Sequence, residues 1–366
     1  MRILYLAPNI PVPGTHGGST HVTHVHRALQ RRGHEVLLLA RRGSTEPGVL
    51  PLGTDLFPVY KHLVPAYYLA RALGPVRRFA PDVIYERYSA FGLGIAFGRA
   101  LGVPSVLMTL DRDASPISFH FSDRIVATSD AFIPARYRDK VRLVHWGVDV
   151  EGLSPAGAAA VRQQLAPSGE AIALYTGSFH RWHGVDALVE VARLWEGPPL
   201  VIALVGDGPD RARIARLAQA VQNPRARVVF VGRVPHADIG GYLAAASVCV
   251  APYAPRLHPI FRVHGMNRDP IKVLEYMALG RPTVTIDIPR MRALFQPGEQ
   301  VLLYPAEDVA ALGAQLRALI EDPALARRVG EAGATLVHAR YSWAHHAEEL
   351  ERVFQEVVPG EPSRSP

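Results

Sequence analysis

Cysteine and long apolar runs are both scarce in this chain of 366 residues. With one cysteine, the chain cannot form an intramolecular disulfide or a cysteine-rich zinc module. Cys249 lies in an apolar run, which is typical of a small core residue rather than a nucleophile. No apolar stretch approaches the ~18 residues of a membrane span, and the run at residues 3–7 is shorter than a signal-peptide core. We therefore expect a cytoplasmic protein.

Acidic residues are in deficit only in the first part of the chain. Residues 1–150 hold 18 lysines and arginines against 11 acidic residues, a net charge of +7, whereas residues 151–366 hold 22 of each. This asymmetry predicts either an ordinary solvated basic surface or an acidic partner, such as a phosphorylated substrate or the anionic inner face of a membrane. Basic runs interleaved with aromatic residues are absent, so we do not expect nucleic acid as a partner.

Strand and helix patterns alternate along most of the chain, in two series. Strands are expected at residues 2–7, 35–40, 81–85, 105–109, 124–128 and 141–145, and again at 171–176, 200–205, 228–231, 248–251 and 283–286. This alternation indicates an α/β protein with parallel sheets covered by helices on both faces. The predicted organisation is a Rossmann-like domain at 1–150, a linker at 151–169, a second Rossmann-like domain at 170–339, a helix at 340–358 that returns to the first domain, and a tail at 359–366.

Three motifs have both a functional and an ordinary interpretation. Gly17 and Gly18 lie between the first strand and the first helix, where a backbone can approach an anion, although a plain turn has the same composition. Asp111 and Asp113 form an Asp-x-Asp pair that could hold a metal on a diphosphate, but this spacing is also frequent by chance. The histidines between residues 21 and 26 have no obvious third ligand for zinc, so packing and solvation explain them better.

The richest stretch of the chain is residues 262–282. Asp269 is predicted to cap a helix that begins at Pro270 and ends at Gly280. Lys272 and Glu275 are three residues apart and share one face of that helix. An anion at the helix start and a sugar hydroxyl at the carboxylate would suit this arrangement, and an exposed Lys–Glu pair is the alternative. The segment 206–209 also begins like a dinucleotide fingerprint, but its third glycine is missing, so NAD is not expected.

Taken in order, these motifs resemble the family-4 retaining glycosyltransferases of the GT-B fold. The likeness covers nearly the whole chain, and no single motif carries it. The matching segments are Gly17-Gly18, 32–36, Ser129, 146–149, 177–184, 206–209, 232–234, 270–282 and 341–343. The resemblance implies two Rossmann-like domains facing across a cleft, a helix crossing back to the first domain, and the transfer of a hexose with retention of configuration.

The resemblance also implies the partners and the roles of two residues. The C-terminal domain would bind a nucleoside-diphosphate sugar, with UDP or GDP as the nucleotide, and the N-terminal domain would shape the site of an unidentified acceptor. Glu275 matches the second carboxylate of the family's Glu-x7-Glu motif, which binds the ribose. Asn267 stands where the first carboxylate faces the donor sugar. The base would be held by backbone groups near Gly232 and Arg233.

The positive charges at the diphosphate differ from the family pattern. Ser178 and His183 stand where the family has an arginine and a lysine. Arg181, Lys272 and a protonated His183 are the expected substitutes, so we expect no metal and no other cofactor. Asp111 lies near the place of the family's catalytic histidine.

The complete set of expected site residues follows from these assignments. The catalytic residues are Lys272, Arg181, Asn267 and Asp111, and the donor-binding residues are Gly17, Gly18, Ser178, His183, Gly232, Arg233, Met266, Asp269, Pro270, Ile271 and Glu275. Two alternatives stay open at this point. A nucleotide-sugar epimerase of the same fold would consume donor without acceptor, and a non-catalytic sugar-binding subunit would bind donor without turnover.

Overall fold

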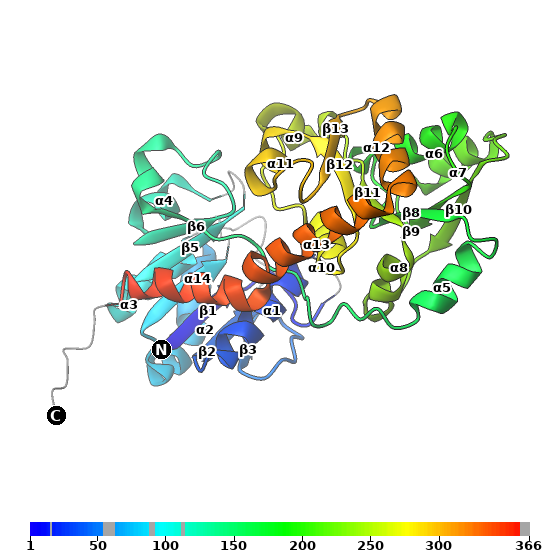
Figure 1. Cartoon of the computed structure of the whole chain (residues 1–366). Coiled ribbons are helices and arrows are strands. Elements are labelled where there is room, and N and C mark those ends of the chain that lie inside the picture. Colours follow the sequence, from blue (N-terminus) through cyan, green and yellow to red (C-terminus); the bar gives the residue numbers. More distant parts are fainter. Residues whose placement is uncertain (15–16, 54–62, 88–91, 111–113, 359–366) are drawn as a thin grey trace. The chain divides into compact units, whose positions relative to one another are not determined.

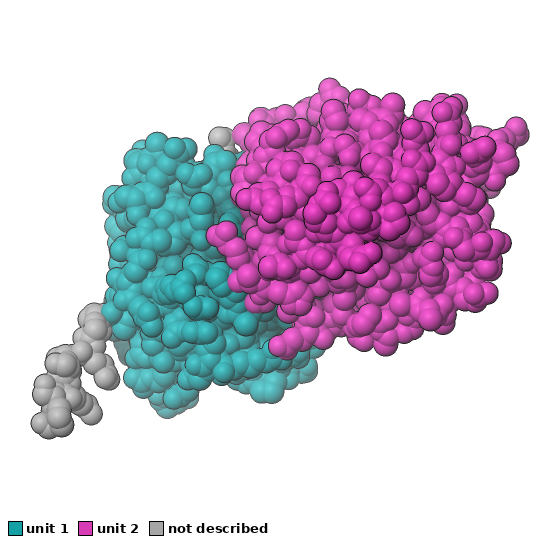
Figure 2. Space-filling model, viewed as in Figure 1, with its two compact units in different colours: residues 1–147, 343–366 teal, residues 148–342 magenta. Residues whose placement is uncertain are grey.

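The chain folds into two compact units, described here from a computed structural model. The structure describes residues 1–14, 17–53, 63–87, 92–110 and 114–358. Unit 1 consists of residues 1–147 with 343–366, and unit 2 of residues 148–342 (Figures 1 and 2). In the described ranges, no helix is long and apolar enough to cross a membrane.

The described part of unit 1 is built on a seven-stranded parallel sheet with the order β3-β2-β1-β4-β5-β6-β7. The strands are β1 (Arg2–Ala7), β2 (Glu35–Ala40), β3 (Val49–Pro51), β4 (Val83–Arg87), β5 (Ser105–Thr109), β6 (Arg124–Ala127) and β7 (Val141–Leu143). The central strands are buried along nearly their whole length. Both faces of the sheet are therefore covered, as parallel sheets require.

Helices cover unit 1 on two sides. They are α1 (Gly17–Arg31), α2 (Val64–Phe79), α3 (Leu93–Leu101), α4 (Pro116–Phe121) and α14 (Trp343–Gln355), with a 3-10 helix at Ala135–Lys140. Successive side chains of a strand point to opposite faces. Accordingly, Ile3 and Tyr5 of β1 pack in one core with buried residues of α1 and α14, whereas Leu4 and Leu6 pack in another core with α2 and α3.

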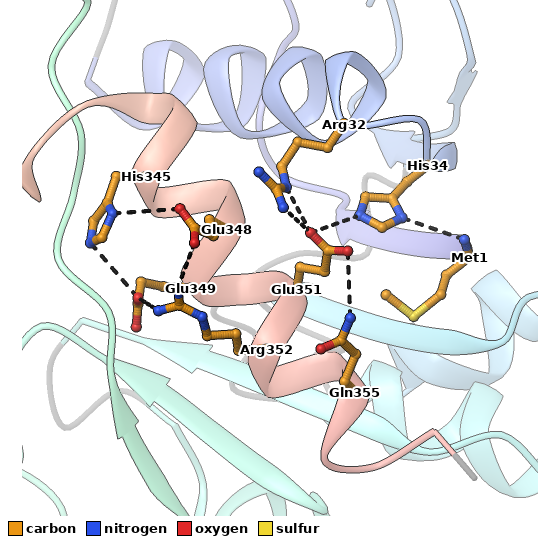
Figure 3. A network of polar contacts seen from close by, with 9 residues as sticks. All are labelled: Met1, Arg32, His34, His345, Glu348, Glu349, Glu351, Arg352 and Gln355. Carbon is orange, nitrogen blue, oxygen red and sulfur yellow. Dashed lines mark hydrogen bonds and ion pairs between the residues drawn. The ribbon is translucent and has the colours of Figure 1, made fainter. Parts of the chain in front are cut away.

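The last helix, α14, is part of unit 1 by packing and by charge. Its buried residue Phe354 packs in the core beneath α1. On its polar side, Glu351 accepts hydrogen bonds from Arg32 and lies 3.9 Å from His34 Nε2 (Figure 3). His34 in turn lies within hydrogen-bond distance of the amino group of Met1. These contacts connect α14 with Met1 and with the residues that follow α1.

Glu356, the residue that follows α14, makes a testable contribution to the stability of unit 1. Glu356 pairs with Arg124 and Arg142, each at 2.7 Å, and its hydrogen bond with Arg142 is the main cause that lowers the pKa of the carboxyl group. Because the pair is about one-third exposed, we expect Glu356→Gln to cost only ~0.2–1 kcal/mol.

The pH dependence of that effect has a definite sign. A carboxyl group with a lowered folded-state pKa stabilises the protein above its unfolded pKa, and this contribution is lost as the pH falls through the folded pKa. Urea unfolding should therefore show a difference in the free energy of unfolding between Glu356→Gln and the parent protein at neutral pH but not at acid pH. A difference that persists after the carboxylate is protonated would contradict the assignment.

Unit 2 has a six-stranded parallel sheet with the order β10-β9-β8-β11-β12-β13. The strands are β8 (Ala171–Thr176), β9 (Leu200–Val205), β10 (Ala226–Gly232), β11 (Val248–Ala251), β12 (Thr283–Asp287) and β13 (Leu302–Pro305). The helices are α5 (Ala158–Leu165), α6 (Val185–Leu194), α7 (Arg211–Gln219), α8 (Ile239–Ala245), α9 (Pro259–His264), α10 (Ile271–Ala278), α11 (Pro289–Leu294), α12 (Val309–Glu321) and α13 (Pro323–Arg340), with 3-10 helices at Arg181–His183, His236–Asp238 and Pro255–Leu257. The predicted α/β class with two parallel Rossmann-like sheets is confirmed.

Residues 148–169 lie in unit 2 and contribute to its core. Leu153 and Leu165 are buried there, and α5 packs on α8. Cys249 of β11 is fully buried in the same core, and burial raises the pKa of its thiol above the usual range. It is therefore an inert core residue, as the sequence predicts.

Candidate functional site

The strand order of unit 2 places a binding position between β8 and β11. The chain builds the sheet outward from β8 to β10, then returns to the other side of β8 and continues through β11 to β13. The loops that leave the carboxyl ends of β8 and β11 therefore run in opposite directions. Open α/β sheets bind ligands in the crevice at such a reversal.

The loops at this edge approach each other too closely for most side chains. Gly206, which follows β9, has φ +130°, and an added Cβ would lie 2.0 Å from the carbonyl oxygen of Gly177. Gly177, which follows β8, has φ +136°, and an added Cβ would lie 3.1 Å from Lys272 Nζ. Glycine permits both conformations. It also leaves the space beside the lysine to a ligand.

Lys272, in the first turn of α10, lies at this edge between two aromatic rings. Its Nζ donates a hydrogen bond to Tyr175 Oη at 3.1 Å. The same Nζ lies 4.6 Å from the ring centroid of Tyr175 and 5.0 Å from that of Tyr253. The negative faces of the two rings attract the ammonium group and hold it in position.

The charge of Lys272 is not neutralised by a carboxylate within unit 2. Burial lowers the pKa of its amino group to about 7, and the charge of Glu275 opposes this shift. In the described ranges, no acidic oxygen lies within 4.0 Å of Lys272 Nζ. A buried ammonium in this state gains the most from an anionic ligand, because the anion restores the charged form.

Glu275 lies one turn further along the same face of α10. Burial raises the pKa of its carboxyl group, while the charges of His236 and Lys272 act in the opposite direction. Within the part of the chain that the structure describes, its oxygens make no hydrogen bond. A half-buried carboxylate with free acceptor oxygens is suited to bind hydroxyl groups of a ligand.

Comparisons with known proteins identify the family. The model described as glycosyl transferases group 1 matches residues 170–322, and that of glycosyltransferase family 4 matches residues 15–152. A GDP-mannose-dependent alpha-mannosyltransferase of Mycolicibacterium smegmatis is 27% identical over 98% of both chains. This chain is a family-4 glycosyltransferase. It is retaining and uses a nucleotide sugar as its donor.

Further relatives and solved structures match this glycosyltransferase over nearly its full length. A glycogen synthase of Mycobacterium tuberculosis is 25% identical over 100% of this chain and 97% of its own. The structure of Anabaena HepE in complex with UDP superposes with a TM-score of 0.73 at 18% identity, over 97% of this chain and 100% of that one. Sucrose-phosphate synthase of Thermosynechococcus elongatus gives 0.71 at 21% identity, over 97% and 98%. The glycosyltransferase therefore has the GT-B fold.

In the glycosyltransferase, two tyrosine hydroxyl groups hold the end of β8 and the loop that follows it, beside Lys272. Tyr276 Oη accepts a hydrogen bond from the backbone N–H of Thr176 at 3.0 Å, and Tyr175 Oη donates one to the carbonyl of Ser178 at 2.8 Å. The sequence analysis missed Tyr175, Tyr253 and Tyr276. Tyr175 and Tyr253 could have been predicted from the sequence, because they lie beside the carboxyl ends of β8 and β11.

His183 lies near Lys272 but does not supply the expected positive charge. It is buried, and its Nδ1 is hydrogen-bonded to the carbonyl of Ser178. Burial is the main cause that lowers the pKa of the imidazole to about 3, followed by the charge of Lys272. The ring is therefore neutral at physiological pH, and the expectation of a second cation at His183 is wrong.

Arg181, Gly232 and Arg233 lie at other points of the glycosyltransferase's carboxyl edge. Arg181 is exposed in the 3-10 helix after β8, and its charge helps to lower the pKa of the Asp210 carboxyl group. The carbonyl of Gly232 accepts a hydrogen bond from the N–H of Gly206 at 2.7 Å. Arg233 is largely exposed and lies 3.6 Å from Asp207. The loops that follow β8, β9 and β10 thus lie at one edge.

The start of α10 differs from the sequence prediction. Pro270 is the N-cap, the helix begins at Ile271, and no side chain caps it. The predicted cap, Asp269, is instead paired with Arg290 at 2.5 Å, and both side chains are more than nine-tenths buried. The prediction of an Asp269 cap is therefore wrong, because the buried arginine binds the carboxylate. Gly280 follows the helix in the left-handed conformation, as expected for the residue that ends it.

Met266 and Asn267 lie in the segment between α9 and α10. Asn267 Nδ2 donates to the carbonyl of His264 at 2.7 Å, which closes the loop after α9. Met266 is buried in the core of unit 2. Ile271 packs partly against that core, and Pro270 is buried.

The remaining expected residues belong to unit 1. Gly17 and Gly18 form the first turn of α1, after the carboxyl end of β1. Asp111 lies outside the described residues, together with Asp113. In the described ranges, no three His, Cys, Asp or Glu side chains are grouped so that they could hold a metal ion.

Proposed function

We propose that unit 2 binds the nucleoside diphosphate of the donor through Lys272 at the diphosphate and Glu275 at the ribose. The observation that carries this proposal is the ammonium of the half-buried Lys272, which lies at the carboxyl edge of the sheet without a carboxylate partner in the described residues. Glu275, on the same face of α10, accepts hydrogen bonds from the two ribose hydroxyls. The base lies against the backbone at Gly232 and Arg233.

Lys272 also serves the chemical step. When the glycosidic bond to the donor breaks, the electron pair stays with the diphosphate, whose negative charge grows in the transition state. A positioned cation stabilises that charge most strongly in a site from which water is excluded. Arg181 is exposed to solvent at the same edge, and its side chain supplies a second positive charge. Transfer then proceeds without a divalent ion.

The relatives and structural neighbours named above differ in the nucleotide that their descriptions give. One relative is described as GDP-mannose-dependent, and one structural neighbour was solved with UDP. A hexose from a UDP or GDP donor is therefore the proposed substrate. The acceptor site belongs to unit 1.

The test of this proposal starts with binding. Thermal unfolding is followed with UDP, GDP and their hexose conjugates, since a ligand that binds the folded state stabilises it by mass action. Donor consumption is then measured with EDTA present. Stabilisation by a nucleoside diphosphate and turnover that EDTA leaves intact are expected. Activity abolished by EDTA and restored by manganese would overturn the metal-free step, and an epimerised donor without transfer would overturn the reaction.

The affinity for the donor should depend on pH through Lys272. In the free protein its pKa is about 7, and a bound diphosphate raises that pKa. Above about pH 7 binding must therefore take up a proton, so affinity should fall by up to ~10-fold per pH unit. Calorimetry with a nucleotide sugar checks this, because its diester phosphates do not titrate in that range. In Lys272→Arg, which stays charged, the slope should disappear; an unchanged slope would contradict the assignment.

A further inference from the structure

Arg87 of unit 1 is a second positively charged side chain at the carboxyl edge of a parallel sheet. It is the last residue of β4, which lies beside β1 at the reversal of strand order in the first sheet. Only 6% of its surface is exposed. Its one hydrogen bond within the described residues is donated by Nε to His21 Nδ1 at 3.3 Å. The four other N–H groups of the guanidinium make no hydrogen bond to a described residue.

The polar side chains around Arg87 include donors that have no acceptor among the described residues. Because His21 Nδ1 accepts from Arg87, the proton of its neutral ring is on Nε2, and this buried atom has no partner in the described residues. Tyr5 Oη and Tyr85 Oη are buried without a partner as well. Both phenols interact electrostatically with the guanidinium. Such a cluster lacks the acceptor that its donors require.

No acidic residue in the described part of unit 1 compensates the charge of Arg87. In the described ranges, no carboxylate oxygen lies within 4.0 Å of Arg87. Glu86 is adjacent in sequence, but its side chain is on the opposite face of β4, where it accepts from the N–H of Gly94 at 2.9 Å. Buried charges are normally paired. The ring of His21, packed against Trp146 at 4.4 Å between centroids, keeps the cluster in place.

We propose that Arg87 and His21 form an anion-binding site at the carboxyl edge of the first sheet, which takes the phosphate group of a phosphorylated acceptor. Guanidinium groups bind phosphate through two parallel hydrogen bonds, and His21 Nε2 supplies a further donor. The net charge of +7 on residues 1–150 attracts such an acceptor over a longer range. The assignment of the bound anion to an acceptor rests on the proposed function, whereas the anion site itself does not.

The decisive experiment is a titration with inorganic phosphate. Thermal unfolding of the full chain is followed for the wild type, Arg87→Met and the control Arg78→Met, which removes an exposed charge from α2. Phosphate should stabilise the wild type and the control alike, and the affinity of Arg87→Met should be ~10- to 150-fold lower, as expected for charge-assisted hydrogen bonds. Phosphate stabilisation that Arg87→Met leaves unchanged would overturn the proposal.

A structural role of Arg87 predicts a different result. If the arginine only supported the fold, Arg87→Met would unfold at a lower temperature without any phosphate. We expect equal or higher stability instead, because an unpaired buried charge is removed. Should Arg87→Met fail to fold, Arg87→Gln keeps a donor for His21 and removes the charge. It should fold and lose phosphate binding, and retention of wild-type phosphate affinity in this variant would overturn the proposal.

Two further measurements assign the source of the phosphate and separate this inference from the proposed function. Binding of soluble sugar phosphates, of phosphatidylinositol vesicles and of neutral vesicles is compared between the wild type and Arg87→Met. The ligand whose binding depends on Arg87 shows the class of the acceptor. Binding of UDP and GDP is measured on the same variants and should be unchanged in Arg87→Met. Nucleotide binding without Arg87-dependent phosphate binding refutes only the acceptor site, and the reverse result refutes only the donor assignment.

Discussion

Replacing Lys272 with methionine should lower transfer by about 100- to 1,000-fold, the effect of removing one donor from a preorganised site for developing negative charge. Methionine has a similar length and keeps the contacts with the rings of Tyr175 and Tyr253, but it carries no charge. The loss should be found mainly in kcat, because the charge on the diphosphate is greatest in the transition state. Single-turnover kinetics with a nucleotide sugar measures it.

The same variant should be more stable than the parent protein at neutral pH. Lys272 has a pKa of about 7 in the folded protein against 10.5 as its ordinary value, so the unfolded chain binds more protons between these values. Lys272 therefore destabilises the folded protein fully below about pH 7, and this destabilisation disappears as the pH rises to about 10.5. Urea unfolding of both proteins should therefore converge at alkaline pH.

A matched control separates the local charge from the net charge of unit 2. Arg262 is exposed on α9, and Arg262→Met should leave both transfer and stability unchanged. Full activity of Lys272→Met would remove this lysine from the mechanism. A loss of stability at neutral pH would show that its contacts with the rings outweigh the cost of its burial.

Replacing Glu275 with glutamine should weaken the binding of the nucleoside diphosphate by ~10- to 150-fold. A hydrogen bond to a charged group is worth ~1.5–3 kcal/mol, and each ~1.4 kcal/mol changes affinity tenfold. Glutamine has the same shape, so the fold is preserved. Its one carbonyl oxygen replaces two anionic oxygens, and its NH2 group cannot accept from a ribose hydroxyl.

Two measurements make this prediction specific to the ribose. Calorimetry with UDP or GDP should show the loss, whereas binding of inorganic pyrophosphate should be unchanged, because pyrophosphate has no ribose. Glu299→Gln, at an exposed position of the same unit, is the control for the removal of a negative charge. Equal nucleotide affinity in Glu275→Gln and the parent would place the ribose elsewhere.

The alternating pattern of the sequence determined the class of fold and the positions of most central strands. Strands such as β1 and β8 are runs of apolar residues with buried faces on both sides, and such runs stand out from their polar loops. Elements at the periphery were missed, because they lack this signal. β13 alternates in burial over only four residues, and α13 has a weak apolar face with small residues such as Gly330 and Gly333 at its contacts.

The sequence also determined that Lys272 and Glu275 share a face of one helix, because residues three apart do so in any α-helix. Only the tertiary structure decided their electrostatic state, since burial and neighbours from β8 and β11 lower the pKa of the lysine amino group and raise that of the carboxyl group. Asp269 shows the same limit: a cap is a local pattern, but Arg290 reaches it from a distant part of the chain. The unpaired guanidinium of Arg87 was likewise invisible in the sequence, because a missing partner is a property of the packed neighbourhood and not of local spacing.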